Sequence, residues 1–294
     1  MSDLIRELVN QIMNNAPTIV FIIAVVYTSS LIDATMNENS LYNEILSLVI
    51  LCICAAPLLK ELSYVAVSAH DAIDEVQVVL SGAIPAMTTM NIGNDNVGNI
   101  IFYLLTEVII VLINKIFFPL VLIYVALSVC AAISDKFNVI GIKNGVKNFF
   151  SWGLGIIMIA FSIISSFSGA LSGAKQTMLG RSLKYTGSMV PVVGRYLSES
   201  ADMTFASINV MKSTVGIGAT TALVSSIAIP VIKITAYIVL YRICSALIKP
   251  VEGKRITQLT DAVADAFTMI AGIVILVGIM AVMNISMLVK ITVA

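Results

Sequence analysis

Five polar residues sit inside long apolar runs of this sequence and are the first candidates for chemistry. They are Glu107, Asn114, Lys115, Lys233 and Arg242. If the runs cross a membrane, each ionisable group costs roughly 2.5–3.5 kcal/mol to insert and tends to face a protein interior or water. Glu107 and Lys115 are eight residues apart, close to two helical turns, and would share one face. The pattern predicts a row of polar side chains inside the membrane, which we call the polar seam. It would line a water-filled pathway or contact a partner helix.

For the lysines there is an alternative, in which their long side chains reach the membrane surface. Lys115 lies just before Pro119, and Lys233 lies just after Pro230. A lysine near such a break can hold its ammonium in the headgroup layer while its methylene groups stay in apolar surroundings. Glu107 has less reach, so it is the strongest candidate for a functional group in the seam.

Glycine and proline pairs mark a second kind of candidate, a re-entrant turn or hinge. Gly82 and Pro85 follow one polar stretch, and Gly187 and Pro191 follow another. A re-entrant backbone is stable in a membrane only where protein or water covers its polar groups, so such turns would line a cavity. The alternative is an ordinary turn that ends a helix. The full set of hinge candidates is Gly82, Pro85, Pro119, Gly187, Pro191 and Pro230.

Small residues at a regular spacing predict a close contact between two helices. Ser165, Gly169 and Gly173 recur every four residues, and residues so spaced lie on one helical face. Their small side chains let two helix backbones approach closely in a membrane. We expect a packing role for them and no chemistry.

One polar cluster outside the apolar runs contains the single histidine of the chain. His70 lies beside Asp71, Asp74 and Glu75. Such a cluster is typical of a solvated helix face, and the alternative is a cation site. We expect no metal site, no cofactor and no catalytic residues. The chain has one histidine, and its four cysteines all lie inside apolar runs, so the sequence offers no recognisable set of metal ligands and no nucleophile with its base.

The composition indicates what must position these residues. Of 294 residues, 59% are hydrophobic and 12% are charged, and the mean hydropathy is +1.00, whereas soluble domains carry about 25% charged residues. The 17 basic and 17 acidic side chains cancel, which argues against nucleic-acid binding. The chain is therefore expected to be a membrane protein.

The apolar runs predict the membrane segments, since about 20 apolar residues are needed to cross a bilayer. The run 100–133 is too long for one straight crossing, so Pro119 either separates two helices or kinks one. The stretch 76–90 is a weak span or a re-entrant piece. The remaining candidates are 17–32, 41–59, 149–174, 214–248 and 266–294. We expect an all-α polytopic membrane protein with six to eight transmembrane helices.

An internal repeat is a further prediction. The Gly82/Pro85 motif is matched by Gly187/Pro191 in the same order and at similar spacing, and Pro119 is matched by Pro230. Duplicated membrane halves with an interrupted segment in matching places are typical of proteins that build a pathway between two repeats. Chance likeness between apolar helices is the alternative. The predicted divisions are an N-terminal segment 1–40, repeats 41–147 and 148–265, and a C-terminal span 266–294.

Three stretches carry a resemblance to a known family. They are Phe-Phe-Pro-Leu-Val-Leu-Ile-Tyr from Phe117, Val-Pro-Val-Val-Gly-Arg-Tyr from Val190, and Leu-Ile-Lys-Pro-Val-Glu-Gly-Lys-Arg from Leu247. From about Leu41 to its end the chain resembles the stage III sporulation protein AE family. The resemblance implies a multi-pass protein of the mother-cell membrane around the forespore. It also implies partners, namely other stage III sporulation membrane proteins, a cytoplasmic secretion-type ATPase and stage II sporulation protein Q.

The function expected on these grounds is that of a membrane subunit in a sporulation channel or secretion-like complex linking mother cell and forespore. Such a subunit would contribute to the conduit or to its scaffold and would not be an enzyme. The alternative is a secondary transporter of a small solute or ion that uses the same repeat. An intramembrane enzyme is disfavoured, because the apolar runs lack paired aspartates, a histidine or a serine with an evident base.

Overall fold

The computed structural model describes an all-helical chain. The described residues are 2–35, 40–90, 96–133, 139–171, 216–251 and 254–293. No strand occurs among them, which confirms the predicted all-α fold class.

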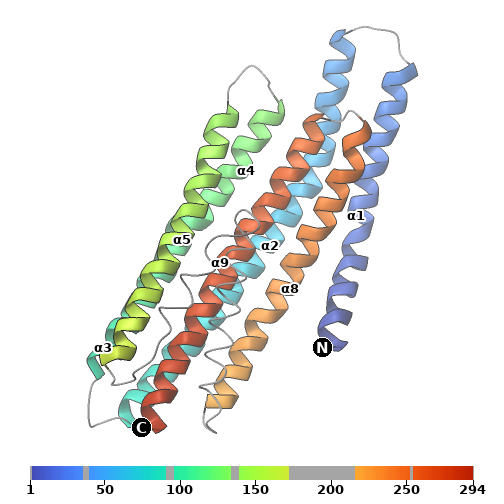
Figure 1. The fold of residues 1–294 in the computed structure, drawn as a ribbon. Helices are drawn as coiled ribbons and strands as arrows, with labels where there is room; N and C mark the ends of the chain where they lie inside the picture. Colours follow the sequence, from blue (N-terminus) through green and yellow to red (C-terminus); the bar gives the residue numbers. More distant parts are fainter. Residues whose placement is uncertain are drawn as a thin grey trace. The chain divides into compact units, whose positions relative to one another are not determined.

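Seven α-helices and two short helical segments make up the described chain (Figure 1). The α-helices are α1 (Ser2–Thr35), α2 (Ser40–Met90), α3 (Asn96–Leu112), α4 (Phe118–Ile133), α5 (Val139–Leu171), α8 (Gly216–Ile248) and α9 (Lys254–Val293). The π-helix η1 (Ile113–Phe117) joins α3 to α4, and the 3-10 helix η3 (Lys249–Val251) follows α8.

Six helical stretches in the described part of the chain are long and apolar enough to cross a membrane. They are Val9–Ile32, Ile45–Ser81, Leu104–Ile133, Val139–Ile164, Leu223–Val251 and Arg255–Asn284. Their surfaces carry many exposed aliphatic and aromatic side chains, such as Trp152 at 75% exposure, which lipid would cover. These features are those of a multi-pass membrane protein, within the predicted range of six to eight spans.

Helix α2 is longer than the sequence suggested. The predicted span ended at Leu59 before Lys60 and Glu61, but the helix continues through these residues to Met90. Lysine and glutamate are good helix formers, so charge alone does not end a helix. At 1.5 Å per residue, its 51 residues extend about 76 Å. Gly82 and Pro85 both lie inside this helix, so the chain makes no re-entrant turn at them.

The apolar run 100–133 forms one uninterrupted series of helical turns. Helix α3 passes into η1 and then into α4, whose second residue is Pro119. Proline lacks an N–H group and its ring crowds the carbonyl of the residue four positions earlier, here Lys115 within η1. A π-helical turn accommodates such a local misfit. Of the two predicted alternatives, the structure has one continuous series, in which α3 and α4 are joined directly through η1.

The chain forms two compact units that share helices. Unit 1 comprises Met1–Ser68, Phe118–Phe149 and Val231–Ala271, and unit 2 comprises Ala69–Phe117, Phe150–Pro230 and Gly272–Ala294. Helices α2, α5, α8 and α9 each contribute a segment to both. Neither unit coincides with a predicted repeat, and the divisions 1–40, 41–147, 148–265 and 266–294 stay a prediction.

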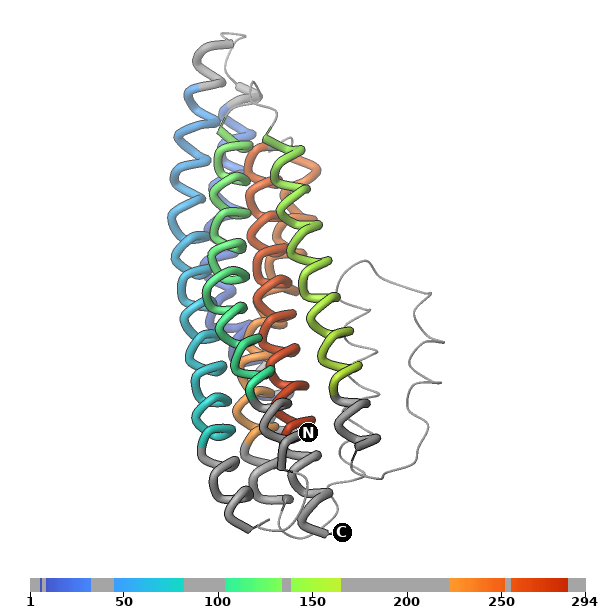
Figure 2. Tube along the Cα trace, turned by 90° about the vertical axis from the view of Figure 1, so that its left-hand side faces the viewer, coloured from blue at the N-terminus to red at the C-terminus, as the bar shows by residue number. Residues whose placement is uncertain are grey.

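Helix α9 supplies the core of each unit. Most of its span is buried, and Figure 2 shows its trace flanked by other helices. In unit 1, the ring centres of Phe267 of α9 and Tyr241 of α8 are 5.2 Å apart, in an edge-to-face arrangement. In unit 2, Asn284 of α9 donates a buried hydrogen bond of 2.7 Å to Thr106 of α3. An apolar helix with polar groups paired this way can be enclosed on all sides.

Candidate polar sites among the membrane helices

Asp265 of α9 is the centre of a charged network in unit 1. Its Oδ2 lies 2.6 Å from Lys147 Nζ of α5 and accepts a hydrogen bond of 2.9 Å from the Tyr124 hydroxyl of α4. Its Oδ1 lies 2.5 Å from a guanidinium nitrogen of Arg242 of α8. The Asp265 side chain is only 15% exposed. One carboxylate thus connects three neighbouring helices to α9.

Asp261 extends the network by one helical turn. Its Oδ1 accepts a hydrogen bond of 2.6 Å from Ser245 and lies 3.7 Å from Arg242. Its Oδ2 lies 3.6 Å from Lys249 Nζ. Lys143 completes the group, with its ammonium 5.5 Å from the centre of the Tyr124 ring, a cation–π distance.

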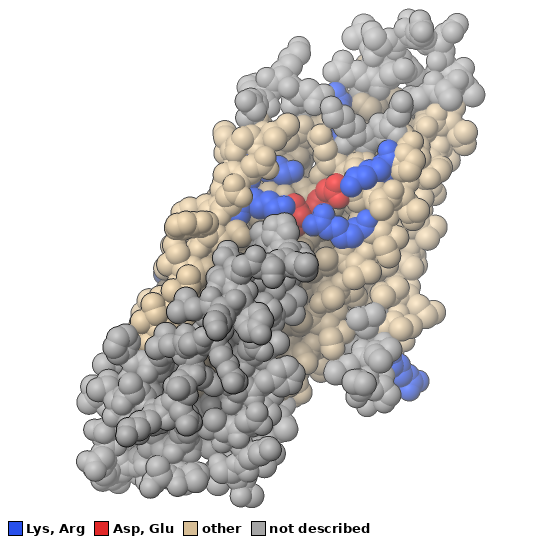
Figure 3. All heavy atoms as spheres, in the orientation of Figure 1, with Lys and Arg blue, Asp and Glu red and all other residues tan. Residues whose placement is uncertain are grey.

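We call Lys143, Lys147, Arg242 and Lys249 the cation cluster. Figure 3 shows basic side chains gathered around acidic ones at one level of the molecular face. Four cations surround two carboxylates here, so the cluster and its aspartates carry a net positive charge. Such an arrangement can fasten helices together and can attract an anion.

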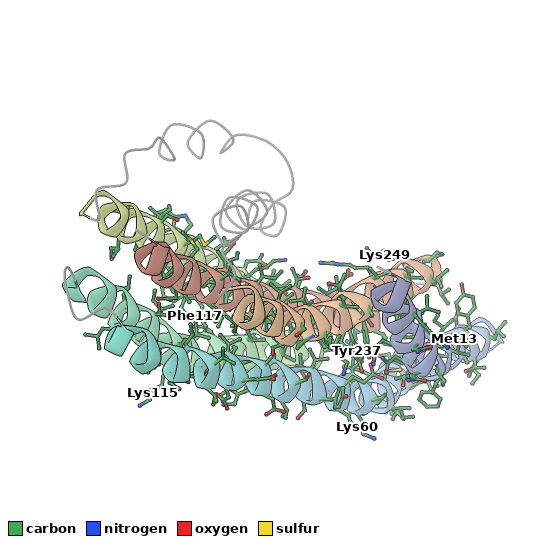
Figure 4. The ribbon with its side chains drawn as sticks, turned by 90° about the horizontal axis from the view of Figure 1, so that it is seen from below. Met13, Lys60, Lys115, Phe117, Tyr237 and Lys249 are labelled. Carbon is green, nitrogen blue, oxygen red and sulfur yellow. The ribbon has the colours of Figure 1, made fainter. Side chains whose placement is uncertain are left out.

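A second polar contact set in unit 1 connects α1, α2 and α8. The Tyr241 hydroxyl donates a hydrogen bond of 2.5 Å to Glu61, and the Tyr237 hydroxyl donates one of 3.1 Å to Asn15. Figure 4 shows Tyr237 directed among the helices. Both rings pack near Phe267 of α9. Each tyrosine therefore combines core packing with a polar link to another helix.

The predicted polar seam is divided between the two units. In unit 2, Glu107 accepts a hydrogen bond of 2.9 Å from Gln77 Nε2 of α2. Asn114 lies in η1, where its Oδ1 is buried with no hydrogen-bond partner among the described residues. Lys115, also in η1, is exposed and points away from the helices (Figure 4). In unit 1, Lys233 is half-buried and Arg242 belongs to the cation cluster. A functional seam of all five stays a prediction.

The predicted hinge and packing residues lie in the first turn of a helix, inside a helix, or outside the described residues. Pro119 lies in the first turn of α4 and Pro230 lies inside α8. Ser165 and Gly169 lie inside α5. Gly173, Gly187 and Pro191 lie outside the described residues.

Close packing occurs at two glycines that the spacing argument did not select. A Cβ atom on Gly278 of α9 would lie 2.9 Å from Ile227 Cγ2 of α8, and one on Gly153 of α5 would lie 2.8 Å from the Phe117 ring. Both contacts are within unit 2. Small residues do not recur at a regular spacing around these two glycines. Only their position in apolar runs could have indicated a packing role.

The histidine cluster lies on an exposed part of α2, within the candidate span Ile45–Ser81. His70 Nε2 lies 3.8 Å from Asp74 Oδ2, and both side chains are about half exposed. Asp71 and Glu75 are exposed as well. In the part of the chain that the structure describes, no group of three potential ligand side chains is placed to hold a metal ion.

Sequence reasoning missed most of the charged network. Lys147, Asp261 and Asp265 lie outside the predicted apolar runs 149–174 and 266–294, but the structure places them inside helices α5 and α9. One signal was available. Asp261 and Asp265 are four residues apart, which puts both carboxylates on one helical face. An apolar helix with such a pair needs cations from its neighbours.

Comparison with known proteins gives two matches. The profile of the family described as stage III sporulation protein AE matches residues 1–292. A protein named stage III sporulation protein AE from Bacillus subtilis (strain 168) is 25% identical over 170 residues, which is 58% of this chain and 43% of that relative. The match therefore spans less than half of the relative's length. No solved structure matches the chain.

Proposed function

The chain belongs to the stage III sporulation protein AE family, and from this premise we propose that it is a membrane subunit of a sporulation complex. In that complex it contributes to the membrane conduit or to its scaffold. The proposed location is the mother-cell membrane around the forespore. The proposed partners are other stage III sporulation membrane proteins, a cytoplasmic secretion-type ATPase and stage II sporulation protein Q.

The observation that carries the proposal is the extent of the family match. Residues 1–292 include all six candidate spans, so the likeness to the family covers the membrane part of the chain and is not confined to one motif. The buried α9 supports a structural subunit, because it gives each unit a stable core around which apolar outer surfaces face lipid.

A gene deletion tests the sporulation role. We expect the deletion to leave vegetative growth unchanged and to lower the yield of heat-resistant spores at least 100-fold, with rescue by the full chain expressed during sporulation. Spores formed at the normal yield without the gene would contradict the proposal.

Reconstitution in liposomes distinguishes a subunit of a complex from a secondary transporter. The purified full chain is placed in liposomes, and uptake of labelled amino acids, sugars and ions is measured under an imposed proton or sodium gradient. We expect uptake equal to that of protein-free liposomes, because a subunit acts only within its complex. Saturable, gradient-driven uptake by the chain alone would contradict the proposal and favour the transporter.

A further inference from the structure

The cation cluster holds more positive charge than its aspartates neutralise. Among the described residues, Asp261 and Asp265 are the carboxylates within ion-pairing distance of Lys147, Arg242 and Lys249. Four cations facing two carboxylates leave an excess of two positive charges. An excess charge of this size among apolar helices is costly unless an anion or water compensates it.

Hydrogen-bond donors of the cluster remain accessible. No carboxylate of a described residue lies within ion-pairing distance of Lys143, whose ammonium instead lies over the Tyr124 ring. Lys249 is 61% exposed, and its Nζ is 3.6 Å from Asp261, too long for a strong hydrogen bond. The Arg242 side chain is 48% exposed. An anion arriving at this face would therefore meet ammonium and guanidinium groups with donors to offer.

Three of the four cations lie at positions along their helices that match the headgroup layer of a bilayer. Helices α5 and α8 each have 33 residues, or about 50 Å, whereas the hydrocarbon layer is about 30 Å thick. Roughly 10 Å, or about seven residues, therefore extends beyond the hydrocarbon at each end. Lys249 directly follows α8, Arg242 lies six residues before its end, and Lys143 lies in the second turn of α5, all within this margin. Lys147 lies one turn deeper than Lys143 in α5, just beyond the margin.

The surroundings of the cluster are apolar, as a lipid site requires. Ile140 lies one turn from Lys143, and Val239 lies one turn from Arg242, each on the same helical face and exposed. Basic side chains at headgroup depth beside exposed aliphatic groups offer both a phosphate contact and an acyl-chain contact. Basic pockets between membrane helices bind acidic headgroups in this way. A soluble phosphate ion would gain nothing from the aliphatic neighbours.

We propose that the cation cluster, Lys143, Lys147, Arg242 and Lys249, is a binding site for the phosphate of an anionic phospholipid headgroup. The lipid phosphate compensates the excess charge, and its acyl chains cover the exposed aliphatic residues beside it. The bound lipid would stabilise the association of α5, α8 and α9 in unit 1. This assignment is independent of what the sporulation complex conducts.

Native mass spectrometry of the full chain tests the site. The protein, in a neutral detergent, is titrated with phosphatidylglycerol and with phosphatidylcholine of the same acyl chains. The test variant is Lys143→Gln/Lys249→Gln, and the matched control is Lys60→Gln/Lys115→Gln, which removes two exposed lysines that point away from the helices (Figure 4). Unfolding temperatures establish that each variant is folded, and the single variant Lys249→Gln serves if the double variant is not.

We expect the unsubstituted chain to prefer phosphatidylglycerol. Each lysine near an anionic headgroup contributes about fivefold in affinity, so the test variant should bind it roughly 25-fold more weakly, while the control changes less than twofold. Equal losses in both variants, or equal affinity for the two lipids, would overturn the proposal. Displacement of phosphatidylglycerol by millimolar inorganic phosphate would overturn the lipid assignment and point to a soluble phosphate site.

Discussion

Asp265 accepts polar contacts from three helices, and its substitution tests what they contribute. Asp265→Asn removes the charge that faces Lys147 and Arg242. Breaking a buried ion pair costs 3–5 kcal/mol, but the two cations are partly exposed and can reach water. We expect the free energy of unfolding in detergent to fall by about 2 kcal/mol.

The control for this substitution is Asp74→Asn, whose side chain is 54% exposed. It should change the unfolding free energy by less than about 0.5 kcal/mol. A loss at Asp265 no larger than at Asp74 would show that the network does not stabilise the fold.

The two tyrosines of α8 offer a comparison at matched burial. Tyr241→Phe leaves the half-buried Glu61 carboxylate without its 2.5 Å donor, whereas Tyr237→Phe removes a 3.1 Å bond to the neutral Asn15. Hydrogen bonds to charged groups contribute about 1.5–3 kcal/mol, and neutral ones about 0.5–1.5 kcal/mol. Thermal unfolding should show the larger destabilisation for Tyr241→Phe, and the reverse order would contradict this interpretation.

Glu107 is the residue on which the predicted seam can be tested separately from the fold. Glu107→Gln keeps an oxygen that can accept the hydrogen bond from Gln77 and removes the charge. A neutral acceptor makes a weaker hydrogen bond, so we expect the free energy of unfolding to fall by about 1 kcal/mol and the spore yield to fall at least 10-fold. A normal spore yield from the folded variant would remove the case for a functional seam.

At the scale of helices, apolar runs predicted the number and type of elements well but their ends poorly. The six candidate spans lie close to predicted apolar runs. The continuation of α2 past Lys60 was missed, and so were the helical turns of α5 and α9 around Lys147 and Asp261, which precede the predicted apolar runs. Hydropathy locates the apolar part of a helix, whereas the helix itself continues until its hydrogen bonding or packing ends. Pairing across helices depends on their packing order, which a single sequence does not contain.

Two glycines test helix packing at this scale. On Gly278→Ala, the new methyl group would meet Ile227 Cγ2 at 2.9 Å, close to the backbone of α8, where little can move. We expect a destabilisation of about 1–3 kcal/mol, as for overpacking of a core. Gly145→Ala in α5 meets no atom within 4 Å, and it should stabilise the helix by about 0.5–1 kcal/mol. Equal unfolding temperatures for both variants would contradict the close contact.

At the scale of the whole molecule, the chain combines six candidate spans with buried polar pairs between helices. A protein of this kind can form a membrane component whose apolar outer faces meet lipid or other subunits. The family match extends over the same spans. On these grounds we propose that the chain is part of a larger membrane complex.

Co-purification from sporulating cells tests membership of this complex. The full chain carries an affinity tag, cells are cross-linked during engulfment, and the membrane extract is purified and its proteins are identified. We expect recovery of other stage III sporulation membrane proteins, and their absence from a parallel purification of an unrelated tagged membrane protein. Recovery of the chain without any of them, from cells that contain them, would contradict the proposal.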